Sequence, residues 1–150
     1  MIPPFRRNGN LPAGLHEASW LELVKRFGTT TRRSLLLEGL KAALDALYAA
    51  GCNKVYVDGS FVTRRPEPGD FDACWDITGV EPGRLDPILL DFSNGRAAQK
   101  ARYLGELFPA QLPEGLSGRT FLDFFQTDRH TGQRKGIVVI DLARWHDDTK

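Results

Sequence analysis

The chain has 150 residues, of which 41% are hydrophobic and 26% are charged, and its formal net charge is +1. These values are ordinary for a soluble globular protein and predict one domain large enough to bury a core. The near-neutral charge gives no indication of nucleic-acid binding, and no apolar run approaches the roughly 20 residues of a transmembrane helix, so we expect no membrane partner.

The first third of the chain predicts an arm followed by two helices. Residues 1–14 hold three prolines and two glycines, which favour an irregular arm. Residues 15–27 carry a helical apolar stripe that ends before Gly28. A second helix is expected over residues 33–50, with a threonine N-cap before it and Gly51 as its end.

A strand and a sharp turn follow the second helix. The β-branched apolar run over residues 55–57 predicts a buried strand. Gly59 and Ser60 end it with a backbone that a ligand can approach closely. Prolines and a glycine within residues 66–69 then break any continuing element.

An acidic pair opens the next predicted strand, over residues 70–77, in which acidic or small residues alternate with bulky apolar ones. A strand repeats every two residues, so Asp70 and Asp72 share one face with Cα atoms about 7 Å apart. Two carboxylates at this spacing can converge on one hard cation, whereas Asp76 lies about 13 Å from Asp72 and is not expected to be a ligand. The alternative is a hairpin that carries solvated acidic residues on its outer face.

The second half of the chain alternates helical and extended segments. Helical segments are expected at 85–90, at 96–102 after a break at Asn94-Gly95, and, in preference to a strand, at 121–125. Strands are expected at 103–108, ended by Pro109, and at 136–142. The polar tail over residues 146–150 is expected to fray.

Cysteine usage indicates a reducing compartment. The chain holds two cysteines, Cys52 and Cys74, and they lack the spacing of metal ligands. We therefore expect two reduced, buried thiols in a cytoplasmic protein.

The stretch from Gly59 to Ala73 resembles the signature of the DNA polymerase beta-like nucleotidyltransferase superfamily. That signature is an apolar residue, Gly-Ser or Gly-Gly, a loop of about ten residues, and then Asp-apolar-Asp/Glu-apolar. Element order extends the resemblance over residues 33–108, and the outer segments resemble a bacterial group of uncharacterised single-domain relatives. The resemblance implies one α/β (α+β) domain over residues 15–145, with a small mixed sheet and helices mainly on one face.

The resemblance also implies an activity, the metal-dependent transfer of a nucleoside monophosphate from a nucleoside triphosphate to an acceptor hydroxyl. Asp70 and Asp72 would bind Mg²⁺ or Mn²⁺ together with a third carboxylate from a later strand. Two candidates exist for this third ligand. Glu106 is preferred on order and spacing, and Asp141, on the clearest predicted strand, is the runner-up, with backbone capping as its non-functional alternative.

Four residues are candidate nucleotide ligands by the same resemblance. Gly59 and Ser60 would lie against a phosphate, and Arg64 and Arg65 would reach the triphosphate, because guanidinium groups suit phosphate oxygens. The structural alternatives are a turn serine and a solvated loop. The remaining basic residues are interpreted as surface charges, with contact of one of them with the nucleotide as the alternative: Arg96, Lys100, Arg102 and Lys135.

The acceptor remains open at this stage. A partner protein is one possibility, by analogy with toxin–antitoxin pairs in which a nucleotidyltransferase modifies the toxin. A catalytically silent binding module, such as an antitoxin or a regulatory partner, is the alternative function, and Glu106 and the proline-rich loop at 64–69 favour it slightly. Convergence of Asp70, Asp72 and Glu106 in the folded protein would favour the enzyme.

Overall fold

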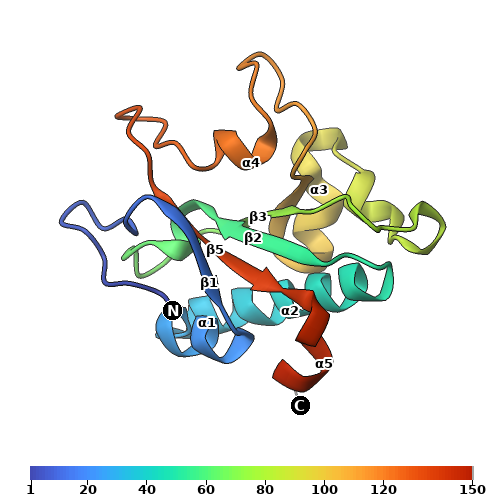
Figure 1. Ribbon diagram of the computed structural model, residues 1–150, viewed down its shortest axis with the longest axis horizontal. Helices are drawn as coiled ribbons and strands as arrows, with labels where there is room; N and C mark the ends of the chain where they lie inside the picture. Colours follow the sequence, from blue (N-terminus) through green and yellow to red (C-terminus); the bar gives the residue numbers. More distant parts are fainter. Residues whose placement is uncertain (150) are drawn as a thin grey trace.

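A computed structural model describes residues 1–149, in which five strands form one mixed sheet in the order β1-β5-β2-β3-β4 (Figure 1). The strands are β1 (Gly14–Ala18), β2 (Lys54–Asp58), β3 (Phe71–Trp75), β4 (Gly105–Pro109) and β5 (Gly136–Asp141). β1 runs parallel to β5 and β4 runs parallel to β3, whereas β2 is antiparallel to both of its neighbours. The predicted mixed α/β class is confirmed.

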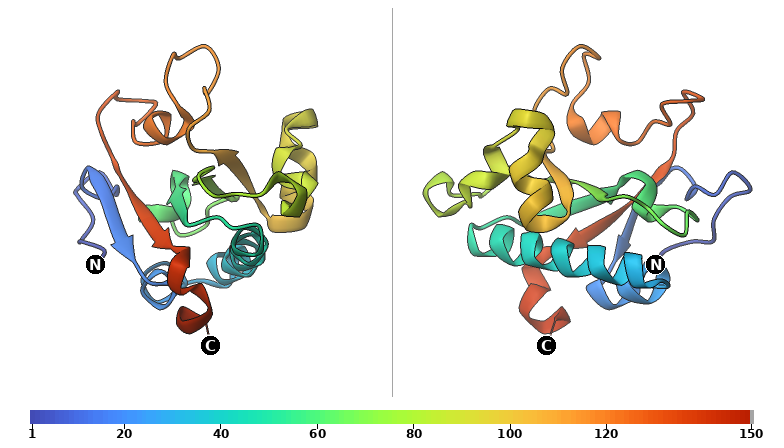
Figure 2. Two further views of the ribbon diagram at one scale, coloured as in Figure 1. Left: turned by 45° about the vertical axis from the view of Figure 1, so that its right-hand side comes forward. Right: turned by 180° about the vertical axis from the view of Figure 1, so that it is seen from behind.

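The helices lie mainly on one face of this sheet, as expected. They are α1 (Trp20–Phe27), α2 (Thr31–Ala49), α3 (Ser93–Tyr103), α4 (Phe121–Phe124) and α5 (Trp145–Asp148). Figure 2 shows α1, α2 and α5 on one side of the sheet, α3 beside β4, and the short α4 on the opposite side. Within residues 1–149, none of the helices combines the length and the apolar character that crossing a membrane requires.

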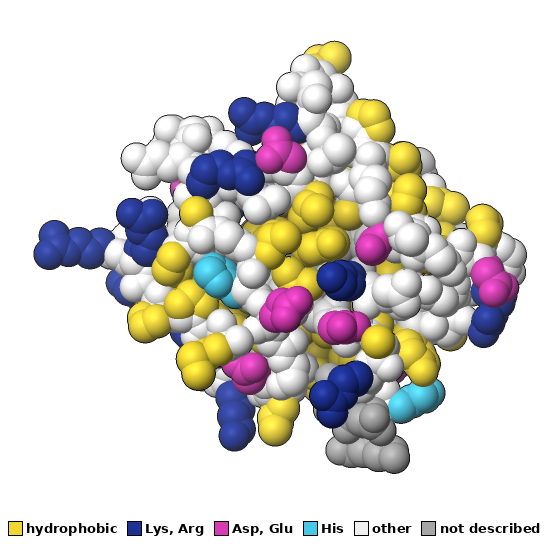
Figure 3. All heavy atoms as spheres, in the orientation of Figure 1, with side chains coloured by type: hydrophobic (Ala, Val, Ile, Leu, Met, Phe, Trp, Pro, Cys, Tyr) yellow, Lys and Arg dark blue, Asp and Glu magenta, His cyan; other side chains and the backbone are white. Residues whose placement is uncertain are grey.

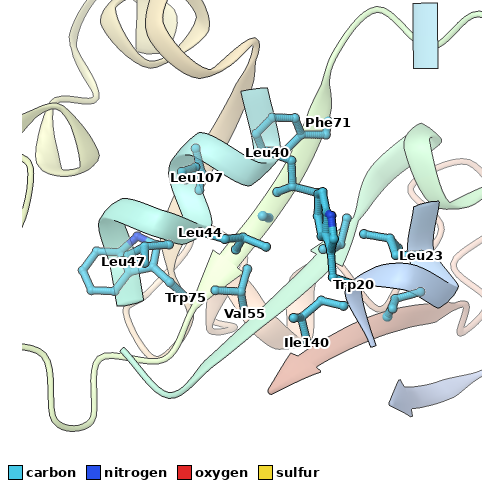
Figure 4. Close-up of a cluster of buried hydrophobic side chains, with 14 of the residues drawn as sticks. Trp20, Leu23, Leu40, Leu44, Leu47, Val55, Phe71, Trp75, Leu107 and Ile140 are labelled. Atoms are coloured by element: carbon cyan, nitrogen blue, oxygen red, sulfur yellow. The ribbon is translucent and has the colours of Figure 1, made fainter. Parts of the chain in front are cut away.

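The core fills the space between α2 and one face of the sheet (Figure 4). Leu40, Leu44 and Leu47 project from α2 at helical spacing and are fully buried. They pack against inward-facing strand residues that alternate along each strand: Val55, Val57, Phe71, Ala73, Trp75, Leu107, Val138 and Ile140. The intervening strand residues therefore point to the other face, where the acidic side chains lie.

Arg33, near the start of α2, connects this helix to the loop that precedes β3. Its side chain is 2% exposed and donates to the carbonyl oxygens of Phe61 (2.6 Å), Thr63 (2.9 Å) and Arg65 (3.1 Å). Its guanidinium also lies 5.1 Å from the centre of the Phe61 ring. Burial lowers the pKa of Arg33. The buried guanidinium of Arg33 is thus stabilised by neutral carbonyl groups, and its hydrogen bonds fix the conformation of the loop before β3.

Residues 15–18 form a strand, so the prediction of one helix over 15–27 is wrong at its start. Backbone pairing with β5 holds Leu15 opposite Ile137 and Ala18 opposite Ile140. The helix begins only at Trp20, because the Ser19 side chain accepts a hydrogen bond from Glu22 N and caps it. Helical spacing alone could not reveal a strand that depends on pairing with a segment more than 100 residues away.

The C-terminal segment is also more ordered than predicted. Residues 145–148 form α5, and Trp145 is 1% exposed, with its indole N–H donating to Asp45 Oδ1 at 2.7 Å. The His146 ring packs edge-on against Tyr48, with ring centres 4.8 Å apart. The contacts of Trp145 and His146 with α2 therefore order this segment despite its polar composition. Lys150 lies outside the described residues.

The predicted break at Asn94-Gly95 is present, and it divides a tight turn from the body of α3. Asn94, Gly95 and Arg96 all have left-handed backbone angles. Leu104 ends α3 in the same conformation, at φ 65°. For this reason the following strand starts at Gly105, two residues later than predicted.

Replacing Arg33 by lysine should destabilise the protein although the charge is kept. A lysine can satisfy only part of the carbonyl set, and each hydrogen bond to a charged group contributes about 1.5–3 kcal/mol. We expect a loss of about 2–3 kcal/mol in the free energy of unfolding, measured by urea denaturation. Arg102→Lys, at an exposed position, is the control and should change stability by less than about 0.5 kcal/mol. Equal effects of the two substitutions would show that the buried carbonyl contacts contribute little.

Candidate functional site

Three carboxylates meet on the open face of the sheet, as the preferred sequence interpretation predicted. Asp72 on β3 lies opposite Glu106 on β4 in the parallel register, and Asp70 precedes β3 by one residue. One oxygen from each of the three side chains lies within 4.8 Å of the others. Oxygen-only donors at this separation have the chemistry that suits Mg²⁺ or Mn²⁺.

Gly59 allows the β2 end to lie directly against this cluster. Antiparallel pairing places Asp58 opposite Asp72, so the turn that follows β2 reaches the Asp72 side chain. Gly59 adopts φ +77°, and a Cβ atom there would overlap Asp72 Oδ2. Both the left-handed backbone and the lack of space therefore require glycine at this position.

Asp72 is the least easily ionised member of the cluster. Burial, followed by the charge of Asp70 and by interactions with Glu106, raises the pKa of Asp72 to about 8. Burial and the charge of Glu106 also raise the pKa of Asp70. With no cation bound, this raised pKa favours the protonated form of Asp72 at neutral pH, in which its hydroxyl donates to Glu106.

Glu106 is held ionised by two basic residues of α3. Arg96 donates from Nε (3.1 Å) and from a terminal nitrogen (2.9 Å) to Glu106 Oε1, and Lys100 Nζ lies 3.2 Å from the same oxygen. Burial opposes ionisation, but hydrogen bonds from Arg96, Asp72 and Lys100 outweigh it and lower the pKa of Glu106. Arg96 and Lys100 are partly exposed, as the interpretation as surface charges expects, but both also pair with Glu106, because the left-handed turn at the start of α3 brings them back over β4.

Asp58 is a buried acid of the site that sequence reasoning did not single out. Its side chain is fully buried, and Oδ1 has no hydrogen-bond partner among the described residues. Oδ2 accepts a weak bond from the Cys74 thiol at 3.7 Å. Burial and then the charge of Asp72 raise the pKa of Asp58 well above its usual value, while Lys135 opposes this shift. An acid at the end of an apolar strand, directly before Gly-Ser, was the available signal.

Arg64 and Arg65 face the N-terminal arm. A terminal nitrogen of Arg64 donates to Arg6 O at 3.2 Å, and its guanidinium lies 5.7 Å from the centre of the Phe5 ring. Both arginines line a cavity of about 360 Å³ at the junction of the arm and the loop. Its other lining residues are Arg7, Asn8, Gly9, Asn10 and Thr63. The basic groups that act on the pKa of Asp70 are instead Lys100, Arg32 and Arg96.

Ser60 stays at the turn beside the cluster, where it is partly exposed. Its carbonyl oxygen accepts from the backbone N–H of Thr63 (3.2 Å) and from the Thr63 hydroxyl (2.6 Å). These bonds close the short 3₁₀ turn over Gly59–Val62. Ser60 can therefore close the turn and still serve as the predicted phosphate ligand, because its backbone carbonyl forms the turn and its hydroxyl is not used there.

Asp141 and Asp76 lie outside the cluster. Asp141 ends β5, is exposed, and accepts a hydrogen bond from Ala143 N at 2.9 Å. It caps the following turn, which is the non-functional alternative considered for it. Asp76 Oδ1 accepts from Thr78 N at 2.9 Å, so this residue also has a local structural role. Of the two candidates for the third carboxylate, Glu106 is the one that the fold brings to Asp70 and Asp72.

Comparison with sequence families gives one match, over residues 3–141, to a family described as a family of unknown function, DUF6932. The chain belongs to this family. The match spans β1 to β5 and therefore includes all three carboxylates and the Gly-Ser turn. Comparison with curated proteins and with solved structures finds no match.

Replacing the ionisable carboxyl group of Asp72 by an amide should stabilise the protein in the absence of divalent cations. Its folded pKa of about 8 lies above the ordinary 3.8, so ionisation of Asp72 favours unfolding as pH rises between these values. We expect Asp72→Asn to raise the melting temperature in EDTA at pH 7.5 by roughly 3 °C or more. Glu106→Gln should lower it, because Arg96 and Lys100 lose their anion. Shifts in the same direction for both variants would contradict this charge distribution.

Adding one methyl group at Gly59 should disrupt the cluster. Gly59→Ala forces a left-handed alanine and a contact with the Asp72 carboxylate, so divalent cation binding should weaken by at least about tenfold. The measurement is calorimetric titration with Mn²⁺. Gly83→Ala is the matched control, because a Cβ atom there meets nothing within 4 Å. Unchanged Mn²⁺ affinity in Gly59→Ala would rule out the cluster as the cation site.

Proposed function

We propose that this protein is a metal-dependent nucleotidyltransferase that moves a nucleoside monophosphate from a nucleoside triphosphate to an acceptor hydroxyl. The observation that carries the proposal is the convergence of Asp70, Asp72 and Glu106 on adjacent strands, directly beside the Gly59-Ser60 turn. This arrangement unites both halves of the motif that resembles the nucleotidyltransferase superfamily. It also leaves a ligand free to approach along the turn backbone.

The residues present fit a divalent cation. The donor set is three carboxylates, and burial and mutual repulsion raise the pKa of Asp72 and of Asp70, a shift that a bound cation would oppose. The fully buried Asp58 Oδ1, which has no hydrogen-bond partner among residues 1–149, adds a second observation, because a buried polar atom of this kind usually contacts a water molecule or an ion. Mg²⁺ or Mn²⁺ would be held by Asp70, Asp72 and Glu106, and when bound it neutralises phosphate charge and orients the triphosphate.

The chain's own residues supply positioning and charge. The Gly59-Ser60 turn would present backbone and a hydroxyl to the phosphates, and the absence of a Cβ atom at Gly59 lets this turn lie directly against Asp72. Glu106, kept ionised by Arg96 and Lys100, orients the acceptor hydroxyl and takes its proton as the oxygen attacks the α-phosphorus. The bond to the leaving pyrophosphate breaks as the new P–O bond forms. Catalysis of this kind rests on alignment and on stabilisation of charge by fixed groups.

We propose a hydroxyl on a partner protein as the acceptor, in the reducing environment of the cytoplasm. The partner is inferred from analogy with toxin–antitoxin nucleotidyltransferases, and therefore from the resemblance. Two free, buried cysteines, Cys52 and Cys74, support the compartment.

One observation favours the alternative of a catalytically silent binding module. Glu106 already has two basic partners, and Asp72 already has a proton, so the cluster is balanced without a cation. Such a module would keep the fold and act as an antitoxin or as a regulatory partner of another protein. The enzyme and the silent module therefore differ in their response to Mg²⁺. In the enzyme, Mg²⁺ would replace the proton of Asp72 and the contacts of Arg96 and Lys100 with Glu106, whereas in the silent module it would not.

The test measures binding and transfer with the same protein. Purified protein is titrated with each nucleoside triphosphate, with Mg²⁺ or with EDTA, and its melting temperature is recorded, because a ligand of the native state raises it by mass action. Protein is then incubated with α-³²P-labelled triphosphates and a lysate, and labelled macromolecules are resolved. We expect a Mg²⁺-dependent shift and a labelled product.

The variants separate the site from the fold. Asp72→Asn and Glu106→Gln should lose binding and labelling by at least about 100-fold, whereas Asp141→Asn should retain both. Metal-dependent binding without any labelling would support the silent module. Absence of a metal-dependent shift at millimolar triphosphate would contradict both versions.

A further inference from the structure

A row of stacked phenylalanine rings lies on the same face of the sheet as the carboxylates, outside the main core. Phe108 on β4 stacks with Phe92 (ring centres 5.9 Å apart, planes at 9°) and with Phe121 of α4 (4.5 Å, 16°). Phe125 packs beside both of these rings, with its centre 5.6 Å from Phe108 at 32° and 6.3 Å from Phe121 at 18°. We call these four rings the phenylalanine row. In Figure 3 hydrophobic side chains gather near the middle of this face, below α4.

The row is continuous with the proposed metal site. Glu106 and Phe108 are two residues apart on β4, so they share a face of the strand. Arg96 bridges them, because its guanidinium bonds to Glu106 and lies 5.7 Å from the centre of the Phe108 ring. A ligand whose anionic groups lay at a cation held by the carboxylates would therefore have these aromatic rings beside it, about 7 Å further along the strand.

The row is open at one end. Phe108, in the middle, is 7% exposed, whereas Phe92, at the end, is 38% exposed. Near-parallel planes distinguish the row from the phenylalanine pairs of the arm and core, such as Phe5 with Phe27 at 58° and Phe27 with Phe61 at 43°. A stack of parallel rings with an exposed end offers a flat π-surface on which another planar ring can lie.

We propose that the phenylalanine row binds the nucleobase of the triphosphate, and that purines bind more tightly than pyrimidines. The proposal rests on the proposed function, because it takes the carboxylate cluster as the place where the phosphates are held. Stacking supplies affinity through ring area, so the larger purine gains more than a pyrimidine. The row would thus set nucleotide preference, and the cluster would carry the chemistry.

The test compares three ligands that share the phosphate chain: ATP, UTP and inorganic tripolyphosphate, each with Mg²⁺. Base stacking on an aromatic side chain strengthens binding, so ATP should bind at least about fivefold more tightly than tripolyphosphate, with UTP between them. Phe92→Leu should reduce ATP affinity by about fivefold and leave tripolyphosphate affinity unchanged. Phe92→Trp, which keeps a flat ring, should restore ATP binding. Calorimetric titration gives all of these dissociation constants.

Leu90→Ala is the matched control, because Leu90 lies in the same segment and is 49% exposed but has no place in the row. Phe125→Leu tests the row independently should Phe92→Leu fail to fold, and it should likewise weaken ATP more than tripolyphosphate. Equal metal-dependent affinity of the wild type for ATP and tripolyphosphate would overturn the nucleobase proposal and leave the proposed function standing. Equal weakening of both ligands in Phe92→Leu would also overturn it. Failure of all three ligands to bind would instead contradict the proposed function.

Discussion

The parallel pairing of β3 with β4 is the constraint on which the candidate site depends. Its register sets Asp72 opposite Glu106 and leaves Phe71 and Leu107 facing the core. Because side chains alternate along a strand, a slip of one residue would turn Glu106 into the core and expose Leu107. The free energy of the hydrophobic core therefore maintains the acidic cluster, although none of the acids contributes to that core.

Two acids of the site, Asp58 and Asp72, lower the stability of the folded protein at neutral pH. Asp58 is fully buried and Asp72 is half-buried, both have raised pKa values, and among residues 1–149 neither forms a hydrogen bond or an ion pair with a basic side chain. Glu106 has two basic partners and remains ionised. Strained or repelling groups persist where function requires them and where the surrounding fold is stable enough to hold them. The arrangement agrees with a site that is completed by a cation, which is the basis of the proposed function.

The loop between β2 and β3 shows how distant parts of the chain prepare this face. Arg33 on α2 binds three loop carbonyl groups, and Arg64 binds the N-terminal arm. The loop is thus held from both sides, and Gly59 at its start can rest against Asp72. Phe121 of α4 packs on the same face of the sheet, against Phe108 of β4. The proposed phosphate and nucleobase sites therefore lie on one face of the sheet.

The sequence by itself determined the local elements: the strand before Gly59, the alternation that puts Asp70 and Asp72 on one face, and the helix that ends at Gly51. These follow from periodicity and from turn residues, which act over a few positions. The tertiary structure alone decided which later acid joins the pair, that Arg96 turns back onto it, and that residues 14–18 form a strand. Each of these depends on pairing or contact between segments far apart in the chain, and a local pattern carries no information about such partners.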